Sequence, residues 1–414
     1  MDTTTNTNTN TNTNTNTNES NSNSNAPIKV YESFDDMGLP DNLLRGIYSH
    51  GFERPSVIQQ RAIKPIADGK DILAQAQSGT GKTGTFCIGS MARIDPTLKV
   101  PQVLVMTPTR ELAQQIESVA KGLSANIPLS VYCAVGGTEL HHDLRALDRG
   151  AQFIIGTPGR IYDLMNRKAL TGGGPALPRN NIRVLILDEA DQMLEDKFHE
   201  QVMCILDLGF SPTTQVALFS ATMPQEVIEV ATRLLRNPVK ILIPPEEVTL
   251  DGIKQYMVEL QKEEWKIEAL LDIYSQLNIN QAMIYCNKRQ RVEWLAEKLQ
   301  AQGFPLSFIH GEMDVGERKR RMHDFRTGSV RVLISTDLLA RGIDVQQVSL
   351  VINYELPTNQ ENYIHRIGRS GRFGRKGVAI NLIGPDEVDM VKEIERHYST
   401  HINILPETIT SLLG

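Results

Sequence analysis

The chain has 414 residues and a formal net charge of −6, with 40% hydrophobic and 22% charged residues. A chain of this length exceeds one ordinary hydrophobic core and predicts roughly two globular domains, which excludes a fibrous or wholly disordered protein. The acidic balance argues against a uniformly basic surface, so any contacts with nucleic acid must be local.

No stretch approaches the ~18 consecutive apolar residues of a membrane span, and no positively charged and then apolar signal opens the chain. We therefore expect a cytoplasmic protein without membrane contact. The four cysteines (Cys87, Cys133, Cys204 and Cys286) lack Cys-x-x-Cys spacing, which argues against a zinc or redox site.

The first residues form a low-complexity segment. Asn, Thr and Ser make up 22 of residues 1–25. Such a segment cannot bury enough apolar surface to offset its chain entropy, so we expect a disordered tail over residues 1–27.

From residue 28 to 242, short apolar runs alternate with helical patterns. This alternation is typical of a parallel sheet with helices on its faces. The predicted strands are Asp71–Ala74, Val103–Met106, Phe153–Ile155, Val184–Leu187 and Val216–Phe219. They define a first α/β domain.

A proline-rich and charged stretch over residues 243–252 breaks the pattern and predicts a linker. A second alternating set follows over residues 253–414. Its predicted strands are Ala282–Tyr285, Leu306–Ile309, Val332–Ile334, Leu350–Ile352 and Val378–Leu382. Val292, Leu295 and Leu299 share one helical face, as expected of a helix packed on a sheet. The fold class is therefore α/β, with two tandem parallel-sheet domains.

A phosphate-binding loop follows the first predicted strand, in Ala76–Thr83. Glycines in such a loop let backbone N–H groups turn toward phosphate oxygens, and the helix start adds partial positive charge. Lys82 is expected to reach the β- and γ-phosphates of ATP, and the Thr83 hydroxyl to ligate Mg²⁺. The other predicted nucleotide contacts here are Ser78, Gly79, Thr80, Gly81 and Gly84.

The strand Val184–Leu187 ends in Asp188-Glu189-Ala190-Asp191. Acids at this edge of a parallel sheet lie where α/β proteins bind ligands. Asp188 is expected to hold Mg²⁺ through water, and Glu189 to orient or deprotonate the attacking water.

Asp188–Asp191 spells the signature of the DEAD-box RNA helicases, and the chain resembles that family over residues 30–414. Other family motifs appear in the family's order: Gly51–Gln59, Pro108–Ala113, Gly136–Gly137, Thr157–Arg160, Ser220–Thr222, Ser335–Asp337, Ala340–Asp344 and His365–Arg372. Leu338–Val348 and Leu356–Tyr363 are similar to the translation-initiation branch of the family. The resemblance implies two RecA-like domains.

The resemblance also implies how the nucleotide is held. In the first domain, Gln59 would read the adenine edge, with Phe52 and Arg54 close to the nucleotide. In the second domain, Asp344 would meet the ribose and Phe373 would cover the adenine. The two arginine fingers on the γ-phosphate would be Arg369 and Arg372, whose spacing can place both guanidinium groups on one face of a helical turn.

For RNA, the resemblance implies contacts from small, hydroxyl or arginine side chains that leave the base edges unread. These are Pro108, Thr109, Arg110, Gly137, Thr157, Gly159, Arg160, Asn287, Gly311 and Thr336. Ser220, Thr222 and His365 would couple the phosphate site to the RNA side.

Two departures stand out from the family pattern. Val315 replaces the glutamine of a Gln-x-x-Arg element that ends at Arg318, and Tyr285-Cys286-Asn287-Lys288 replaces the usual Phe-x-Asn-Thr. The sequence also ends at Leu412-Leu413-Gly414 without the basic tail that some relatives use to hold RNA, so we expect weak RNA affinity and dependence on partners.

The resemblance implies an ATP-dependent RNA helicase that locally separates short duplexes without sequence specificity, in translation initiation. Implied partners are single-stranded RNA, a scaffold subunit of the cap-binding complex (initiation factor 4G-like) and an RNA-binding stimulatory factor. The same residues also suit an ATP-locked RNA clamp of the exon-junction type, or a DNA helicase. ATP turnover with release of RNA would favour the RNA helicase. A long-lived ATP–RNA complex would favour the clamp.

Overall fold

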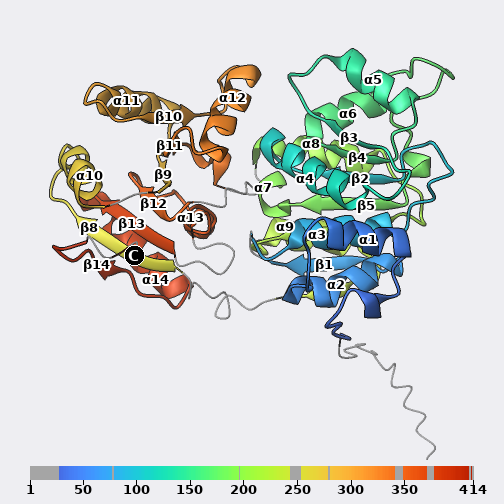
Figure 1. Cartoon of the computed structure of the whole chain (residues 1–414), viewed down its shortest axis with the longest axis horizontal. Helices are drawn as coiled ribbons and strands as arrows, with labels where there is room; N and C mark the ends of the chain where they lie inside the picture. The colour runs from blue at the N-terminus through green and yellow to red at the C-terminus, as the bar shows by residue number, and fades with distance from the viewer. Residues whose placement is uncertain are drawn as a thin grey trace, which may run out of the picture.

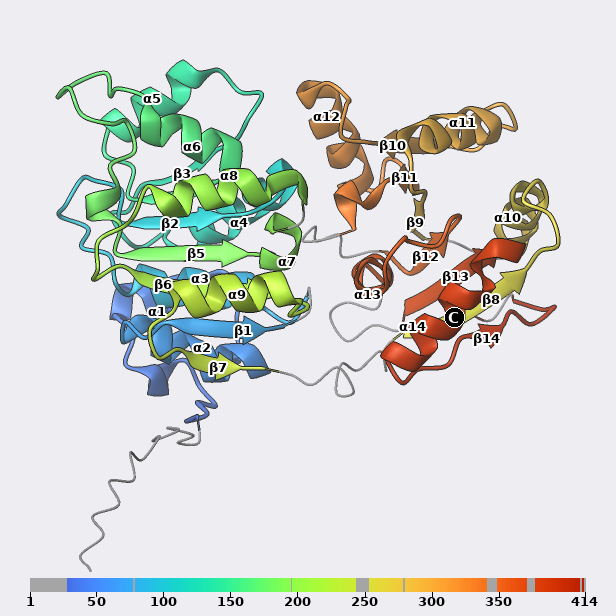
Figure 2. The same cartoon turned by 180° about the vertical axis from the view of Figure 1, so that it is seen from behind.

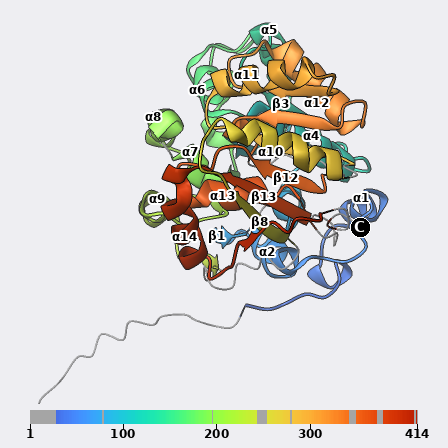
Figure 3. The same ribbon diagram turned by 90° about the vertical axis from the view of Figure 1, so that its left-hand side faces the viewer.

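The computed structural model describes residues 28–76, 79–194, 196–242, 253–277, 280–340, 348–370, 377–409 and 412. The predicted tail (residues 1–27) and the predicted linker (residues 243–252) lie outside these ranges. Two α/β domains lie side by side (Figures 1 and 2), and in Figure 3 the second domain stands in front of the first. No helix in the described part of the chain is long and apolar enough to cross a membrane.

The first domain is built on a seven-stranded sheet in the order β3-β4-β2-β5-β6-β1-β7, and every pairing is parallel. Its strands are β1 (Ile72–Gln75), β2 (Val103–Met106), β3 (Val131–Ala134), β4 (Phe153–Gly156), β5 (Val184–Asp188), β6 (Gln215–Ser220) and β7 (Val239–Ile241). Its helices are α1 (Asp41–Ser49), α2 (Val57–Ala67), α3 (Lys82–Met91), α4 (Arg110–Leu123), α5 (Leu140–Asp148), α6 (Pro158–Asn166), α7 (Ala190–Met193), α8 (Asp196–Asp207) and α9 (Gln225–Leu234), with 3₁₀ turns at Asp35–Met37 and Arg179–Asn181.

The second domain also has a seven-stranded parallel sheet, in the order β10-β11-β9-β12-β13-β8-β14. Its strands are β8 (Ile253–Glu259), β9 (Ala282–Tyr285), β10 (Leu306–Ile309), β11 (Val332–Ser335), β12 (Leu350–Asn353), β13 (Gly377–Ile383) and β14 (Asn403–Ile404). Its helices are α10 (Trp265–Gln276), α11 (Arg289–Gln300), α12 (Val315–Arg326), α13 (Gln360–Ile367) and α14 (Val388–His397), with 3₁₀ turns at Asp337–Leu339 and Pro385–Glu387.

Each sheet buries both of its faces under helices. In the first domain, α1–α4 pack on one face, and α6–α9 pack on the other (Figures 1 and 2). In the second domain, α10 and α11 share a core with one face, whereas α12, α13 and α14 cover the other. Burial on both faces explains why the central strands are continuous apolar runs, such as the fully buried Val103–Met106.

All of the strands that the sequence predicts are confirmed, apart from differences at their ends. The strands that it missed are β3, β7, β8 and β14, which lie at or next to sheet edges. Their residues are only partly buried, and Asn403 and Ile404 of β14 are both exposed. A half-buried strand does not need a continuous apolar run, so these strands carry a weaker signal in the sequence.

Candidate functional site at the domain interface

The predicted phosphate loop connects β1 to α3. Gly79 and Gly81 have positive φ angles of 89° and 99°, which glycine adopts at no steric cost. A Cβ atom on Gly81 would also lie 2.7 Å from the Ser56 hydroxyl. Thr80–Thr83 therefore turn tightly into the N-terminus of α3, as an anion-binding loop requires. Ser78 lies outside the described residues.

Lys82 meets two of the acids at the end of β5. Its Nζ atom is 2.9 Å from Oε1 of Glu189 and 4.0 Å from Oδ1 of Asp188, and all three side chains are almost fully buried. Glu189 has a φ angle of 54°, an uncommon conformation for a residue with a side chain and one that concentrates at functional sites. The motifs at residues 79–83 and 188–191 thus form one cluster.

Burial and mutual charge set the protonation of this cluster. Burial raises the pKa of Asp188 to about 7, against the opposing effect of Lys82. Burial also disfavours charge on Lys82 and Glu189, but their attraction prevails, so the pKa of Lys82 is raised and that of Glu189 is lowered. A Lys82–Glu189 ion pair beside Asp188, which a divalent cation would help to ionise, suits a triphosphate with such a cation.

Two of the residues predicted to contact the nucleotide base, Gln59 and Phe52, lie next to this loop. The Gln59 side chain accepts a hydrogen bond from the Ser56 backbone N–H at 2.8 Å and donates one to the Gly81 carbonyl at 3.4 Å. Phe52 lies against Gly84, where an added Cβ would be 3.1 Å from the ring, while Arg54 is exposed. Gln59 thereby ties the start of α2 to the phosphate loop.

The second domain reaches the cluster through α13. Nε2 of His365 lies 3.4 Å from Oδ2 of Asp191, and both side chains are buried. Arg369 follows one turn later, is also buried, and donates its Nε hydrogen to the His365 carbonyl at 3.1 Å. The other second-domain residues predicted to hold nucleotide, Asp344, Arg372 and Phe373, lie outside the described residues.

Asp191 also joins the acid loop to the end of β6. Its backbone N–H donates to the Ser220 hydroxyl at 3.1 Å, and its carboxylate accepts from the Thr222 hydroxyl at 2.8 Å. The three residues predicted to couple the two sides of the site therefore all contact Asp191.

A cleft of about 700 Å³ spans both domains beside this cluster. All of the predicted RNA-contact residues except Gly137 line this cleft. The complete lining is Pro108, Thr109, Arg110, Gly136, Thr157, Pro158, Gly159, Arg160, Asp163, Gln192, Phe198, Gln201, Asn287, Gly311, Arg318, Thr336, Asp337, Leu338 and Asn362. Gly137 lies instead beneath Arg110 and Val315, both of which a Cβ atom would displace. Burial and the nearby Arg318 and Arg160 cations lower the pKa of Arg110, which favours an anion in the cleft.

A buried ion pair that the sequence analysis missed joins the two domains next to the cleft. Nε and Nη2 of Arg318 donate to the Glu111 carboxylate at 2.9 and 2.6 Å, across 207 residues of chain. Both side chains are nearly inaccessible to solvent. In the sequence, the only indication of this pair is an acidic residue, Glu111, in the first turn of a helix. An acid at that position is also explained by its interaction with the helix dipole, so it does not identify a partner.

Glu111→Gln is expected to weaken domain closure. Truncating one partner of a buried charge pair costs about 2–5 kcal/mol, so the RNA concentration for half-maximal stimulation of ATP hydrolysis should rise at least ~30-fold. The measurement is an RNA titration of phosphate release. Glu117→Gln, which removes a partly exposed pair with Lys121 on the same helix, is the control and should leave the titration unchanged. Equal midpoints for both variants would contradict this prediction.

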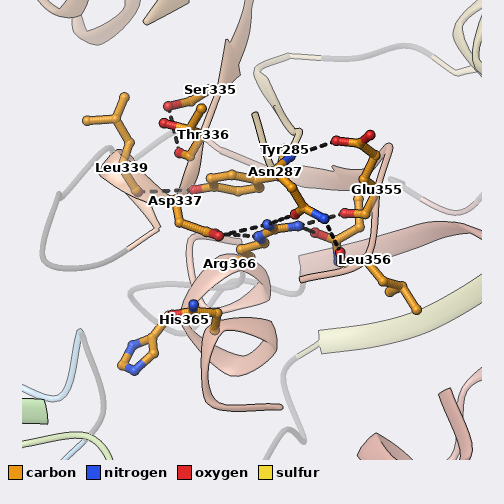
Figure 4. A network of polar contacts seen from close by, with 12 residues as sticks. Tyr285, Asn287, Ser335, Thr336, Asp337, Leu339, Glu355, Leu356, His365 and Arg366 are labelled. Atoms are coloured by element: carbon orange, nitrogen blue, oxygen red, sulfur yellow. Dashed lines mark hydrogen bonds and ion pairs between the residues drawn. The ribbon is translucent and has the colours of Figure 1, made fainter. Parts of the chain in front are cut away.

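Arg366 organises the second-domain wall of the cleft (Figure 4). The side chain is fully buried and bonds both carboxylate oxygens of Asp337 at 2.5 and 2.9 Å, Oδ1 of Asn287 at 2.6 Å and the Glu355 carbonyl at 2.7 Å. Its guanidinium also lies 5.4 Å from the ring centroid of Tyr285. In Figure 4, His365 points away from this network while Arg366 points into it. Adjacent residues of α13 thus face the acid loop and the cleft.

The Tyr285 hydroxyl adds a tie that the usual phenylalanine at this position could not make. It donates to the Leu339 carbonyl at 3.0 Å and so fastens the end of β9 to the turn after Thr336. The departure at this motif therefore retains the aromatic ring and adds a hydrogen bond.

Arg366→Ala is expected to destabilise the second domain by about 3 kcal/mol, since it leaves Asp337 and Asn287 without their buried cation. Both tryptophans of the chain, Trp265 and Trp294, lie in this domain. Tryptophan fluorescence during urea unfolding should therefore show an earlier transition. Arg396→Ala, an exposed change on α14, serves as the control, and an unshifted midpoint for Arg366→Ala would refute the structural role.

No group of three or more His, Cys, Asp or Glu side chains placed to hold a metal occurs within the described ranges. A cation at Thr83 and Asp188 would therefore need oxygen ligands from phosphates and water, which is how Mg²⁺ is usually held at nucleotide sites. Burial raises the pKa of Asp188, and a cation bound there would favour the ionised carboxylate.

Two family models match the chain: DEAD/DEAH box helicase over residues 56–230, and helicase conserved C-terminal domain over residues 265–374. The ATP-dependent RNA helicase eIF4A of Schizosaccharomyces pombe is 53% identical over 385 residues, which are 93% of this chain and 96% of that protein. A structure of S. cerevisiae Dbp5 bound to RNA and ADP BeF3 is similar at a TM-score of 0.84 and 34% identity, covering 91% of this chain and 96% of that one. The DEAD-box helicase Mss116 bound to ssRNA and UDP-BeF is similar at a TM-score of 0.79 and 25% identity, covering 92% and 81%.

Proposed function

The chain belongs to the DEAD/DEAH box helicase family as an eIF4A-like, ATP-dependent RNA helicase, and from this premise we propose that it opens short RNA duplexes locally and without sequence specificity. The observation that carries the proposal is the position of Asp191. This residue belongs to the acid loop beside Lys82, bonds Thr222, and meets His365 of the second domain. One buried side chain, that of Asp191, therefore contacts both the segment after β6 in the first domain and His365 in the second.

The proposed hydrolysis begins with the triphosphate on the N-terminus of α3. The backbone N–H groups after Gly79 and the Lys82 ammonium would hold the phosphates, which places the γ-phosphate beside Glu189. Glu189, ionised through its pairing with Lys82, would orient and accept a proton from the attacking water. Mg²⁺, held by Thr83 and through water by Asp188, would offset the charge that develops on the phosphates.

Closure of the domains would complete this site. Arg369 is buried beside His365, and we propose that it supplies charge stabilisation to the γ-phosphate together with Arg372. Asp344 and Phe373 would hold the ribose and adenine from the same domain. Because these groups belong to the second domain, hydrolysis would depend on the contacts that bring the domains together.

The cleft supports binding of single-stranded RNA through its backbone. Its lining combines glycines, hydroxyl groups and Arg110, Arg160 and Arg318, which suit phosphates and ribose hydroxyls rather than base edges. Separating four or five base-pair steps costs roughly 6–7 kcal/mol at about 1.4 kcal/mol per step, with the DNA value as a proxy. One closure could supply that amount, whereas roughly twenty base pairs would need far more, which favours local opening over long-range translocation.

We further propose a role in translation initiation in the cytoplasm, where the protein would clear structure from mRNA leaders. The support for this role is the name eIF4A of the similar curated proteins. A scaffold subunit similar to initiation factor 4G and an RNA-binding stimulatory factor would be the partners.

The test is ATP hydrolysis by the full chain with and without single-stranded RNA, with strand release from a short duplex followed in parallel. We expect RNA to stimulate turnover and each closure to release a strand. Stimulation by DNA oligomers to the same extent would favour a DNA helicase. A long-lived ATP–RNA complex with almost no turnover would instead favour the exon-junction type of clamp.

A further inference from the structure

A second, smaller cavity lies on the other side of the Glu111–Arg318 ion pair. Its volume is about 120 Å³, and its lining comes from α4 of the first domain and α12 of the second: Arg110, Glu111, Gln114, Val315, Lys319, Met322, His323 and Arg326. We refer to it as the seam pocket. Because each domain supplies part of the wall, the seam pocket exists only when the domains are together.

The seam pocket has a basic rim and an apolar floor. Lys319, His323 and Arg326 are exposed and share one face of α12, while Met322 is buried beneath them. The single acid in the lining, Glu111, is already paired with Arg318. The lining therefore holds more basic than acidic side chains.

The seam pocket and the RNA cleft share one lining residue. Arg110 lines both cavities, and its guanidinium lies over Gly137 next to Val315. Val315 is the valine that replaces the family's glutamine, so this wall is apolar where a polar side chain would otherwise stand. A strand whose phosphate contacts Arg110 would therefore also border the seam pocket, which Arg110 lines.

We propose that the seam pocket is an extension of the RNA site, in which Lys319 binds a backbone phosphate and Val315 and Met322 contact the adjoining nucleotide. The inference rests on the proposed RNA helicase function and adds a subsite that forms only on closure. RNA fits better than an acidic protein segment because Arg110 already joins this rim to the RNA cleft. The extra phosphate contact would add affinity that is sensitive to the nucleotide state.

Lys319→Gln tests the proposal in the full-length chain, with oligoribonucleotides of roughly 6 and roughly 16 residues, lengths that span typical single-strand sites. With a non-hydrolysable ATP analogue, the variant should bind the longer RNA at least 3-fold more weakly. The slope of log affinity against log salt should fall by about 0.7, the value for one phosphate contact on a single strand. The shorter RNA, and both RNAs without nucleotide, should bind as they bind the unmodified chain.

Arg320→Gln is the matched control, since Arg320 lies on the same helix with 72% of its side chain exposed and outside the seam pocket. If both substitutions weakened RNA binding equally, the loss would come from the lower positive charge of the helix in general. That result would overturn the proposal. An unchanged salt slope for Lys319→Gln would also overturn it. If the unmodified chain showed no RNA-stimulated hydrolysis with either RNA, the proposed function itself would fail, which is a distinguishable result.

Discussion

Lys82→Ala is expected to lower RNA-stimulated ATP hydrolysis by a factor on the order of 10²–10³, the loss seen when one donor to a developing anion is removed. We propose that Lys82 contacts the β- and γ-phosphates, and its side chain is buried, so ions from solvent should not replace its charge. Steady-state phosphate release at saturating RNA measures this loss. Retention of more than a tenth of the activity would remove Lys82 from the phosphate site.

The same substitution has a second consequence for the acids of the cluster. Without Lys82, the buried Glu189 loses its ion-pair partner at 2.9 Å, and its pKa should rise. The carboxyl would take up a proton instead of unfolding the domain, so the variant should remain folded near neutral pH. An unchanged circular dichroism spectrum provides this control and separates loss of chemistry from loss of structure.

The sequence predicts those features whose physical signal is local. A buried parallel strand is a short apolar run, and the chain shows such runs at every central strand of both sheets. The edge strand β14 has exposed residues and so offers no run to detect. The phosphate loop and the acids after β5 are local as well. Each motif is a short run of residues that directly follows a predicted strand.

Contacts between distant parts of the chain were not predictable in the same way. The pairing of Glu111 with Arg318 depends on how two domains meet, and neither residue has a neighbour in sequence that reveals its partner. Arg366 stands within a basic run of the sequence, yet it is fully buried, since the ends of β9, β11 and β12 converge on it. A buried arginine needs several acceptors at once, and only the fold brings them together.

We propose that these long-range contacts couple the ATP site to the RNA site. Asp191 bonds both the segment after β6 and His365, while the next residue, Arg366, holds Asn287 in the wall of the cleft. Helix α13 thus contacts the acid loop with one residue and the RNA side with the next. Any shift of α13 relative to the acid loop would move Arg366 and so change the position of Asn287. This linkage gives a physical basis for the proposed coupling of RNA binding to hydrolysis.

Arg369→Lys is expected to lower the maximal rate of ATP hydrolysis about 10³-fold or more, within the 10³–10⁵ range of arginine fingers. Lysine keeps the charge but loses the planar fork that can bind two phosphate oxygens, so retention of charge alone should not rescue the rate. ATP affinity, to which the phosphate loop of the first domain and Asp344 and Phe373 would also contribute, should change by no more than a few-fold. Single-turnover hydrolysis at saturating RNA, with ATP affinity measured separately, resolves the two effects.

Lys392→Ala, on the exposed surface of α14, provides the matched control and should hydrolyse ATP at the unmodified rate. Two outcomes would contradict the assignment of Arg369. Equal loss of ATP affinity and rate would place the residue in nucleotide binding rather than in transition-state stabilisation. A rate within ten-fold of the unmodified chain would mean that the second domain completes the site through other groups, of which Arg372 is the next to substitute.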